Sequence, residues 1–407
     1  MTTTAQPQVP DILSAEFAAD PYAAYRIMRE HYPLIHHEAT RSYIVSRYDD
    51  VQRAFKEPVF TTDNYDWQLE PVHGRTVLQM SGREHAVHRA LVAPAFRGTT
   101  LQERFLPVIE RNARELIDGF RDRGSTDLVA EFATLFPVYV IADMLGLDKA
   151  DHPKFHDWYT SIIAFLSNLS GDEEVTAAGL RTRDAFAAYM LPIIRERRDN
   201  PGDDLLSTLC AAEIDGTRMT DEDIKAFCSL LLTAGGETTD KAIASVFANL
   251  LAHPDQMAAV RADRSLIGRA FAETLRYTPP VHMIMRQPAE DVEFSGGTVP
   301  AGATVTCLIG AANRDPEHYA DPDTFNLFRE DLTARNAFTA AADHLAFALG
   351  RHFCVGALLA RAEVETGLNL LLDAMPDARL PEGFTPAEQG VFTRGPRSLP
   401  LEFTPAG

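Results

Sequence analysis

The feature that most constrains this chain is one cysteine, Cys354, in a short loop with Gly350 before it and Gly356 after it. A helix is predicted directly after the loop, over residues 357–374. A thiol at the start of a helix meets unpaired backbone N–H groups and the positive end of the helix dipole, which lower its pKa. Glycines have no Cβ and allow the backbone to lie close to a large flat molecule. The loop therefore indicates an anionic sulfur that faces a planar ligand.

Two interpretations of Cys354 follow from the residues alone. A lone cysteine beside turn glycines is more often a buried structural residue. The alternative is a ligand of haem iron, because a hydrogen-bonded thiolate is one of the axial ligands that tune this metal. Arg351 and His352 add positive or donor groups beside the sulfur. The chain has no Cys-x-x-Cys-His motif, so covalent attachment of haem is excluded.

Composition and charge exclude several classes of protein. The 407 residues include 38 Lys and Arg and 58 Asp and Glu, a formal charge of −20. This charge disfavours nucleic acid and anionic membranes as partners, since both attract basic surfaces. The four cysteines lack zinc spacing and are typical of a reducing cytosol. There is neither a signal-peptide pattern nor an apolar run near ~18 residues, so we expect a cytoplasmic protein without a membrane span.

The hydrophobic pattern predicts a mainly helical chain with short strands. No Gly/Ser linker and no repeat divides it, so we expect disorder over residues 1–15 and one domain over residues 16–407. An irregular stretch over 61–80 is a candidate substrate lid, because long irregular loops are often functional. Helices are predicted over 22–31, 48–55, 84–96, 103–122, 128–145, 156–166, 179–198 and 220–252. Strands are predicted at 42–46, 292–294, 297–299 and 304–308, with a strand hairpin around 391–393.

The longest of these helices carries an unusual centre. Gly235 and Gly236 stand directly before Glu237 and Thr238. Each glycine costs roughly 1 kcal/mol relative to alanine inside a helix, so some benefit should offset them. One interpretation is a kink or bulge that leaves a polar notch beside the acid and the hydroxyl. The other is a close helix crossing that requires small residues.

The cysteine loop also matches a known pattern. Its residues Phe347, Gly350, His352, Cys354 and Gly356 form Phe-x-x-Gly-x-His-x-Cys-x-Gly. This pattern resembles the haem-binding loop of the cytochrome P-450 family, with alanine at position 348 where the family more often has glycine. The resemblance implies that family's triangular, helix-rich α+β fold, mainly α with small β-sheets. It also implies haem b between the long central helix and the cysteine-loop helix, with Cys354 as the axial iron ligand.

Resemblance extends to the glycine-containing helix and to haem-binding residues. Residues 234–238 are similar to the family's oxygen-binding helix, which implies that Glu237 and Thr238 are catalytic and that Ala234 and Gly235 border the haem. In the family many bacterial members have a larger residue where Gly236 stands, which would widen the pocket here. Residues that the resemblance implies as donors to the haem propionates are His85, Arg89, Arg286 and His352.

One further motif is implied to be structural. Glu273 and Arg276 resemble the family's Glu-x-x-Arg pair, a buried ion pair joined to the segment before the haem loop. The third partner in the family is often an arginine at the position of Thr324. We therefore expect Arg329, or a changed network, to take that part.

The resemblance implies a haem-thiolate monooxygenase that inserts one oxygen atom of O₂ into a small, largely apolar substrate by hydroxylation or epoxidation. Electrons would come from NAD(P)H through a ferredoxin and its reductase, with Arg351 and Arg361 as docking candidates, and we expect a monomer. His73 and His282 are candidate polar anchors, or are simply solvated. The candidate pocket residues are Trp67, Leu69, Phe165, Leu169, Leu230, Val281, Ile284 and Phe392.

Two alternatives remain open at this point. One is a different haem-thiolate enzyme, a peroxygenase or a dehydratase. The other is a non-catalytic protein that binds haem or another small ligand. The intact pair Glu237 and Thr238 counts against both. The pattern does not name a substrate, and tailoring of a secondary metabolite or hydroxylation of a terpenoid or fatty acid would each fit.

Overall fold

The computed structural model describes residues 7–168 and 171–405. The chain forms two compact units, and each is assembled from separate stretches of sequence. The first unit contains Met1–Asn64, Ser245–Cys354 and Thr385–Arg397. The second unit contains Tyr65–Ala244, Val355–Phe384 and Ser398–Gly407. One domain over residues 16–407 stays a prediction.

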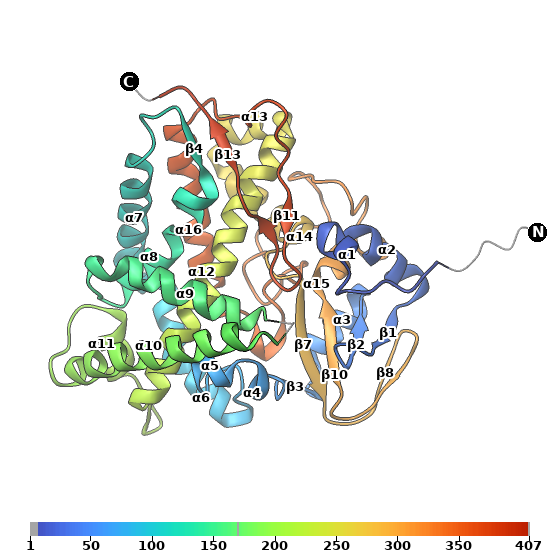
Figure 1. Cartoon of the computed structure of the whole chain (residues 1–407), viewed down its shortest axis with the longest axis horizontal. Helices are drawn as coiled ribbons and strands as arrows, with labels where there is room; N and C mark the ends of the chain where they lie inside the picture. Colours follow the sequence, from blue (N-terminus) through green and yellow to red (C-terminus); the bar gives the residue numbers. More distant parts are fainter. Residues whose placement is uncertain (1–6, 169–170, 406–407) are drawn as a thin grey trace, which may run out of the picture. The chain divides into compact units, whose positions relative to one another are not determined.

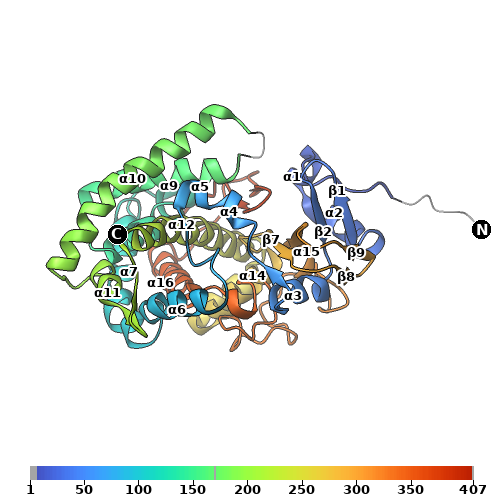
Figure 2. The same ribbon diagram turned by 90° about the horizontal axis from the view of Figure 1, so that it is seen from below.

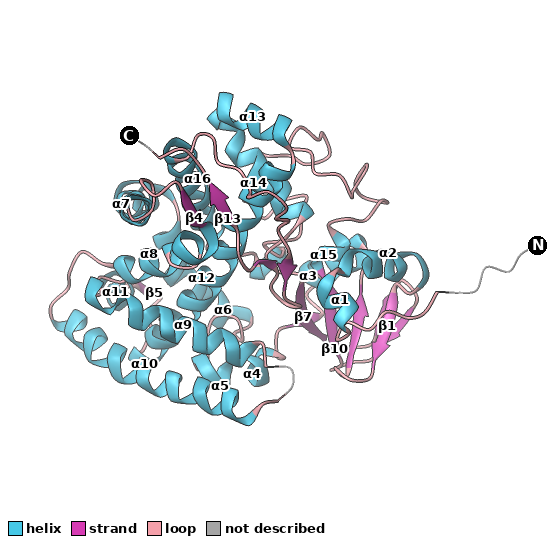
Figure 3. Cartoon of the chain, turned by 45° about the horizontal axis from the view of Figure 1, so that its top comes forward, coloured by secondary structure: helices cyan, strands magenta, loops and turns pink. Residues whose placement is uncertain are grey.

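The first unit contains most of the β-structure (Figure 3). Its main sheet has five strands in the order β1-β2-β10-β7-β3, with β10 parallel to β2 and antiparallel to β7 (Figure 1). The strands of the first unit are β1 (Leu34–His37), β2 (Ser42–Val45), β3 (Phe60–Thr61), β7 (Met283–Pro288), β8 (Val292–Phe294), β9 (Gly297–Val299), β10 (Thr304–Leu308), β11 (Glu388–Gln389) and β12 (Gly395–Pro396). Its helices are α1 (Ala15–Ala19), α2 (Pro21–His31), α3 (Tyr48–Lys56), α13 (Pro254–Ala262), α14 (Ile267–Tyr277) and α15 (Ile309–Ala312).

The second unit is mainly helical, and its helices α9 and α10 lie side by side (Figure 2). Its helices are α4 (Tyr65–Gln68), α5 (Glu70–His73), α6 (Gly82–Val92), α7 (Leu106–Asp118), α8 (Phe136–Met144), α9 (His152–Leu166), α10 (Glu173–Asp199), α11 (Leu205–Ala211), α12 (Asp221–Ala252) and α16 (Ala357–Ala374). The last turns of α12 belong to the first unit. The strands of the second unit are β4 (Ser125–Asp127), β5 (Glu213–Ile214), β6 (Thr217–Arg218) and β13 (Pro400–Glu402). Within the described residues, no helix is long and apolar enough to cross a membrane.

Several predicted boundaries were wrong for physical reasons. The helices predicted over 103–122 and 128–145 each divide into a π-helical turn and an α-helix, and the α-helices begin beside Pro107 and Pro137, which have no N–H to donate. The irregular stretch over 61–80 contains the short helices α4 and α5. Order also begins before residue 16, because Ile12 is buried in an apolar cluster.

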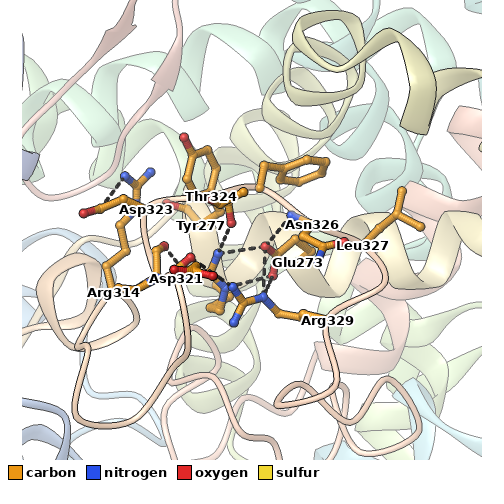
Figure 4. Close-up of polar contacts among 12 residues, drawn as sticks. Glu273, Tyr277, Arg314, Asp321, Asp323, Thr324, Asn326, Leu327 and Arg329 are labelled. Atoms are coloured by element: carbon orange, nitrogen blue, oxygen red, sulfur yellow. Dashed lines mark hydrogen bonds and ion pairs between the residues drawn. The ribbon is translucent and has the colours of Figure 1, made fainter.

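A buried charge network holds the segment that leads to the cysteine loop (Figure 4). Glu273 and Arg276 on α14 are both fully buried and form a bidentate ion pair, with an Nη2–Oε1 distance of 2.7 Å. Arg329 lies within 3.1 Å of the same carboxylate, as expected for the missing arginine at position 324. The Arg276 guanidinium also donates to the carbonyls of Asn313, Pro322 and Thr324. Buried charges are tolerated only when they are paired and hydrogen-bonded in this way.

Replacing Arg329 should therefore destabilise the fold strongly. In Arg329→Met the buried Glu273 carboxylate loses one of its two cationic partners, and we expect the free energy of unfolding to fall by about 3 kcal/mol. Urea unfolding followed by circular dichroism measures this change. The matched control is Arg114→Met, which removes an exposed ion pair with Glu110 and should cost less than about 1 kcal/mol. Equal effects of the two substitutions would contradict a structural role for the network.

Candidate functional site

The cysteine loop is closed by its own backbone and by α3. The Cys354 N–H donates to the carbonyl of Phe347 at 2.9 Å. Gly350 has φ +68°, and a Cβ there would lie 2.7 Å from the carbonyl oxygen of Phe55. Glycine is thus required by the left-handed backbone and by the contact with α3. Ala348 also has a left-handed φ of 53°, which explains why glycine is the easier residue at that position.

Exposure singles out Cys354 among the four cysteines. Its residue is partly exposed, whereas Cys210, Cys228 and Cys307 are buried. Burial raises the pKa of each of these three thiols, that of Cys307 to about 12. They are inert core residues. Because α16 follows Cys354 within a few residues, this sulfur alone combines access with a helix N-terminus, which fits an iron ligand.

The glycine pair of α12 does not interrupt the helix. α12 runs without a break from Asp221 to Ala252, so no bulge interrupts the helix at the glycines, and a kink there stays a prediction. A Cβ on Gly235 would lie 2.8 Å from Cδ1 of Ile141 on α8, and one on Gly236 would lie 3.0 Å from the ring of Tyr159 on α9. The glycines therefore serve a close helix crossing. Gly236 is buried against these neighbours, so it does not widen a pocket.

Glu237 is held by partners that the sequence did not reveal. Tyr159 Oη donates to Glu237 Oε2 at 2.5 Å. Lys241, one turn further along α12, places its Nζ 3.8 Å from Glu237 Oε1 and 3.0 Å from Asp240 Oδ2. Burial raises the pKa of Tyr159 far above its usual value, so this tyrosine remains a donor. The close crossing at Gly236 is what brings Tyr159 within reach of the carboxylate.

Thr238 lies on the more open side of α12. Its Oγ1 donates to the carbonyl of Ala234 at 2.7 Å, and Ala234 itself is exposed. Because the hydroxyl proton is already engaged, the oxygen lone pairs remain available to accept a hydrogen bond. On another side of the helix, Thr239 Oγ1 donates to Glu363 Oε2 at 3.5 Å, and burial raises the pKa of Glu363 well above its usual value.

The predicted propionate donors occur as two pairs, one in each unit. His85 and Arg89 lie one turn apart on α6, with His85 buried. In the first unit Arg286 is buried on β7 with its guanidinium 5.0 Å from the Phe55 ring centroid, and His352 is partly exposed at the end of the 3₁₀ turn Gly350–His352. The side chains of all four predicted donors carry N–H groups that can donate hydrogen bonds to carboxylates.

The candidate pocket residues divide between the two units. In the first unit Val281 pairs with Thr393 at the tip of the β11–β12 hairpin, and Val281, Ile284 and Phe392 are all partly exposed. In the second unit Trp67 is 59% exposed on α4, whereas Leu69 is buried. Phe165 and Leu230 are partly buried on α9 and α12, and Leu169 lies outside the described residues.

The two candidate polar anchors are not solvated. His73 is buried, its Nδ1 is 2.8 Å from Ser229 Oγ on α12, and burial lowers its pKa to about 3. His282 is buried with Nδ1 2.8 Å from Tyr25 Oη, and burial lowers its pKa well below the usual value. Both rings are neutral and form contacts within the protein, so each serves to hold segments together.

Comparison with known proteins identifies the class. The family model for "Cytochrome P450" matches residues 20–375. The chain is 44% identical to pulcherriminic acid synthase of Bacillus subtilis, over 96% of this chain and 97% of the relative. It is 35% identical to the cyclomarin C epoxidase CymV of Salinispora arenicola, over 93% and 94% of the two chains. The structure of cytochrome P450 CYP109Q5 from Chondromyces apiculatus superposes with a TM-score of 0.87 at 32% identity, covering 98% of each chain.

The chain therefore belongs to the cytochrome P450 family. It is a haem-thiolate monooxygenase, and its fold is the helix-rich fold of that family. Such an enzyme uses haem, O₂, a small-molecule substrate and electrons from redox partners. When bound, haem supplies the iron at which O₂ is activated. The relatives also include enzymes of secondary metabolism.

Proposed function

We propose that this monooxygenase acts on a small, largely apolar metabolite and that its product is pulcherriminic acid or a chemically close compound. The observation that carries this proposal is the 44% identity to pulcherriminic acid synthase over almost the whole of both chains. The cyclomarin C epoxidase CymV and the cytochrome P450 monooxygenase PikC are less similar, at 35% and 33% identity. The partly exposed side chains of Val281, Ile284 and Phe392 support an apolar substrate.

The product can be assayed directly. We expect the purified protein, supplied with a surrogate ferredoxin, a reductase, NADPH and the substrate of the Bacillus relative, to form pulcherriminic acid detectable by mass spectrometry. The reduced protein under carbon monoxide should show the red-shifted Soret band of a thiolate-ligated haem. That band without any oxygenated product would overturn the proposed substrate and leave the class intact. Absence of the band would contradict the role of Cys354.

The residues have the following proposed parts. Cys354 ligates the iron, and its backbone N–H already closes the loop on Phe347. His85, Arg89, Arg286 and His352 bind the two propionates, because guanidinium and imidazole donors neutralise carboxylates in a dry site. The residues proposed to border the haem are Ala234, Gly235, Phe347, Gly350 and Gly356.

Glu237 and Thr238 deliver protons to the oxygen site. Thr238 cannot easily donate, since its hydroxyl proton is engaged by the Ala234 carbonyl. It accepts a hydrogen bond and so fixes the position of a water beside it. The Glu237 carboxylate then exchanges a proton between that water and its surroundings, which is the work of a general acid–base group.

The role of Thr238 predicts a loss of coupling between electron use and product. Thr238→Ala removes the acceptor oxygen, so we expect haem and substrate to bind as before while product per NAD(P)H consumed falls by about a hundredfold, at the low end of what a positioned proton-transfer group contributes. Hydrogen peroxide should account for the difference. Thr238→Ser keeps the hydroxyl and is the matched control. Unchanged coupling in the alanine variant would reject the assignment.

Electrons reach the enzyme, we propose, from a ferredoxin reduced by an NAD(P)H-dependent reductase, with the enzyme acting as a cytoplasmic monomer. Within the described residues no disulfide joins the cysteines, which supports a reducing compartment. Arg351 binds the carbonyls of Phe60 and Pro58, so it anchors the cysteine loop as well as adding charge. Arg361 on α16 is 45% exposed and pairs with Glu365, and it remains the better docking candidate.

Charge reversal tests the docking role of Arg361. Because ferredoxins are acidic, Arg361→Glu should slow reduction by a surrogate ferredoxin by about tenfold at low salt, and the difference should shrink as salt screens the charges. Stopped-flow reduction measures the rate. Arg181→Glu is the control, since Arg181 is an exposed arginine on α10 with one acidic partner. Equal rates for the two variants would remove Arg361 from the docking face.

A further inference from the structure

One lysine on α12 stands between two buried carboxylates. Lys241 Nζ lies 3.0 Å from Asp240 Oδ2 but 3.8 Å from Glu237 Oε1. The Asp240 side chain is 2% exposed, that of Glu237 10% and that of Lys241 17%. Thr134 Oγ1 adds a hydrogen bond to Asp240 Oδ2 at 3.3 Å. The Lys241 ammonium therefore lies closer to Asp240 than to Glu237.

This difference in distance matters because Glu237, and not Asp240, is the acid for which we propose a part in proton delivery. An ammonium in full contact with a carboxylate favours its ionised form and fixes its orientation. A carboxylate that must exchange protons with a neighbouring water would lose both mobility and basicity in such a pair. With Lys241 drawn toward Asp240, the Tyr159 hydroxyl, a neutral donor, makes a shorter contact with Glu237 than the ammonium does.

We propose that Asp240 is a positioning residue for proton delivery, which binds Lys241 and so keeps it from forming a full ion pair with Glu237. This inference rests on the proposed role of Glu237 as the proton-delivering acid. The charged and titratable groups near Glu237 include Lys241 and Asp240 from α12 and Tyr159 from α9. Asp240 acts through Lys241 and makes no contact with the reacting atoms.

A purely structural role explains Asp240 poorly. Burial raises its pKa to about 6 even with Lys241 beside it, so the fold disfavours the ionised form of this residue. Its Oδ1 is buried, and no hydrogen-bond partner for it is found in the part of the chain that the structure describes. A buried pair with one unsatisfied oxygen costs stability, and a function that needs the carboxylate would account for its presence.

The decisive experiment is a cycle of three variants, Asp240→Asn, Lys241→Met and the double variant, with substrate, redox partners and NAD(P)H present. We expect Asp240→Asn alone to lower product per NAD(P)H by about tenfold and to raise the solvent deuterium isotope effect on turnover, because Lys241 then moves to Glu237. The double variant should recover to within about twofold of the parent enzyme, since the offending cation is gone. A double variant as impaired as Asp240→Asn would overturn the proposal.

A second measurement does not depend on turnover. Infrared titration of the protein without substrate, with Glu237→Gln used to identify the Glu237 carboxyl band, should show protonation of Glu237 at a pH lower by about one unit in Asp240→Asn. The shift should vanish in the double variant, and a missing shift in Asp240→Asn would overturn the proposal.

Turnover of Glu237→Gln separates the two ideas. If its coupling is normal, the proposed role of Glu237 fails and the inference about Asp240 falls with it. If its coupling is lost while Asp240→Asn couples normally, only the inference fails.

Discussion

The close approach of α9 to the backbone of α12 is the contact that sets the position of Glu237, the acid that we propose delivers protons. It is possible only because Gly236 has no side chain, since a Cβ there would lie 3.0 Å from the Tyr159 ring. Two glycines inside a 32-residue helix cost roughly 2 kcal/mol relative to alanine. That cost is offset by the packing of α8 and α9 against the helix and by a tyrosine hydroxyl delivered to Glu237. The same two residues thus set helix packing and the position of the acid.

The cysteine loop is organised by a different constraint, namely contacts of its own backbone that close the loop. Gly350 presses against the Phe55 carbonyl, Arg351 binds the carbonyl of Phe60, and Cys354 donates to Phe347. A loop fixed by main-chain contacts presents the sulfur in one place, which limits the entropy lost when iron is bound. Gly350, which the sequence suggested for contact with a flat ligand, is also required by the fold.

Local signals predicted part of this arrangement from the sequence, and long-range packing supplied the rest. The spacing around Cys354 and the apolar pattern over residues 220–252 are properties of neighbouring residues, so the loop and the long helix were predictable. Arg329 was one of two alternatives predicted, beside a changed network, because the family often has an arginine at the position of Thr324. Tyr159 could not be foreseen, since 78 residues separate it from Glu237 and tyrosine on a helix carries no signature. Predicted helices failed at Pro107 and Pro137, where a missing N–H ends the ladder that the apolar pattern alone would extend.

The buried carboxylates of Glu273 and Asp240 differ in how completely their oxygens are hydrogen-bonded. The Glu273 carboxylate accepts from Arg276, from Arg329 and from the Asn326 N–H, so its oxygens are saturated and one arrangement is strongly preferred. Asp240 has an oxygen without a hydrogen bond, and its lysine lies closer to it than to Glu237. A partly satisfied network has alternative arrangements of similar energy. Saturation suits an element that must hold the segment leading to the cysteine loop, whereas incomplete satisfaction suits the role in proton delivery that we propose for Glu237 and Asp240.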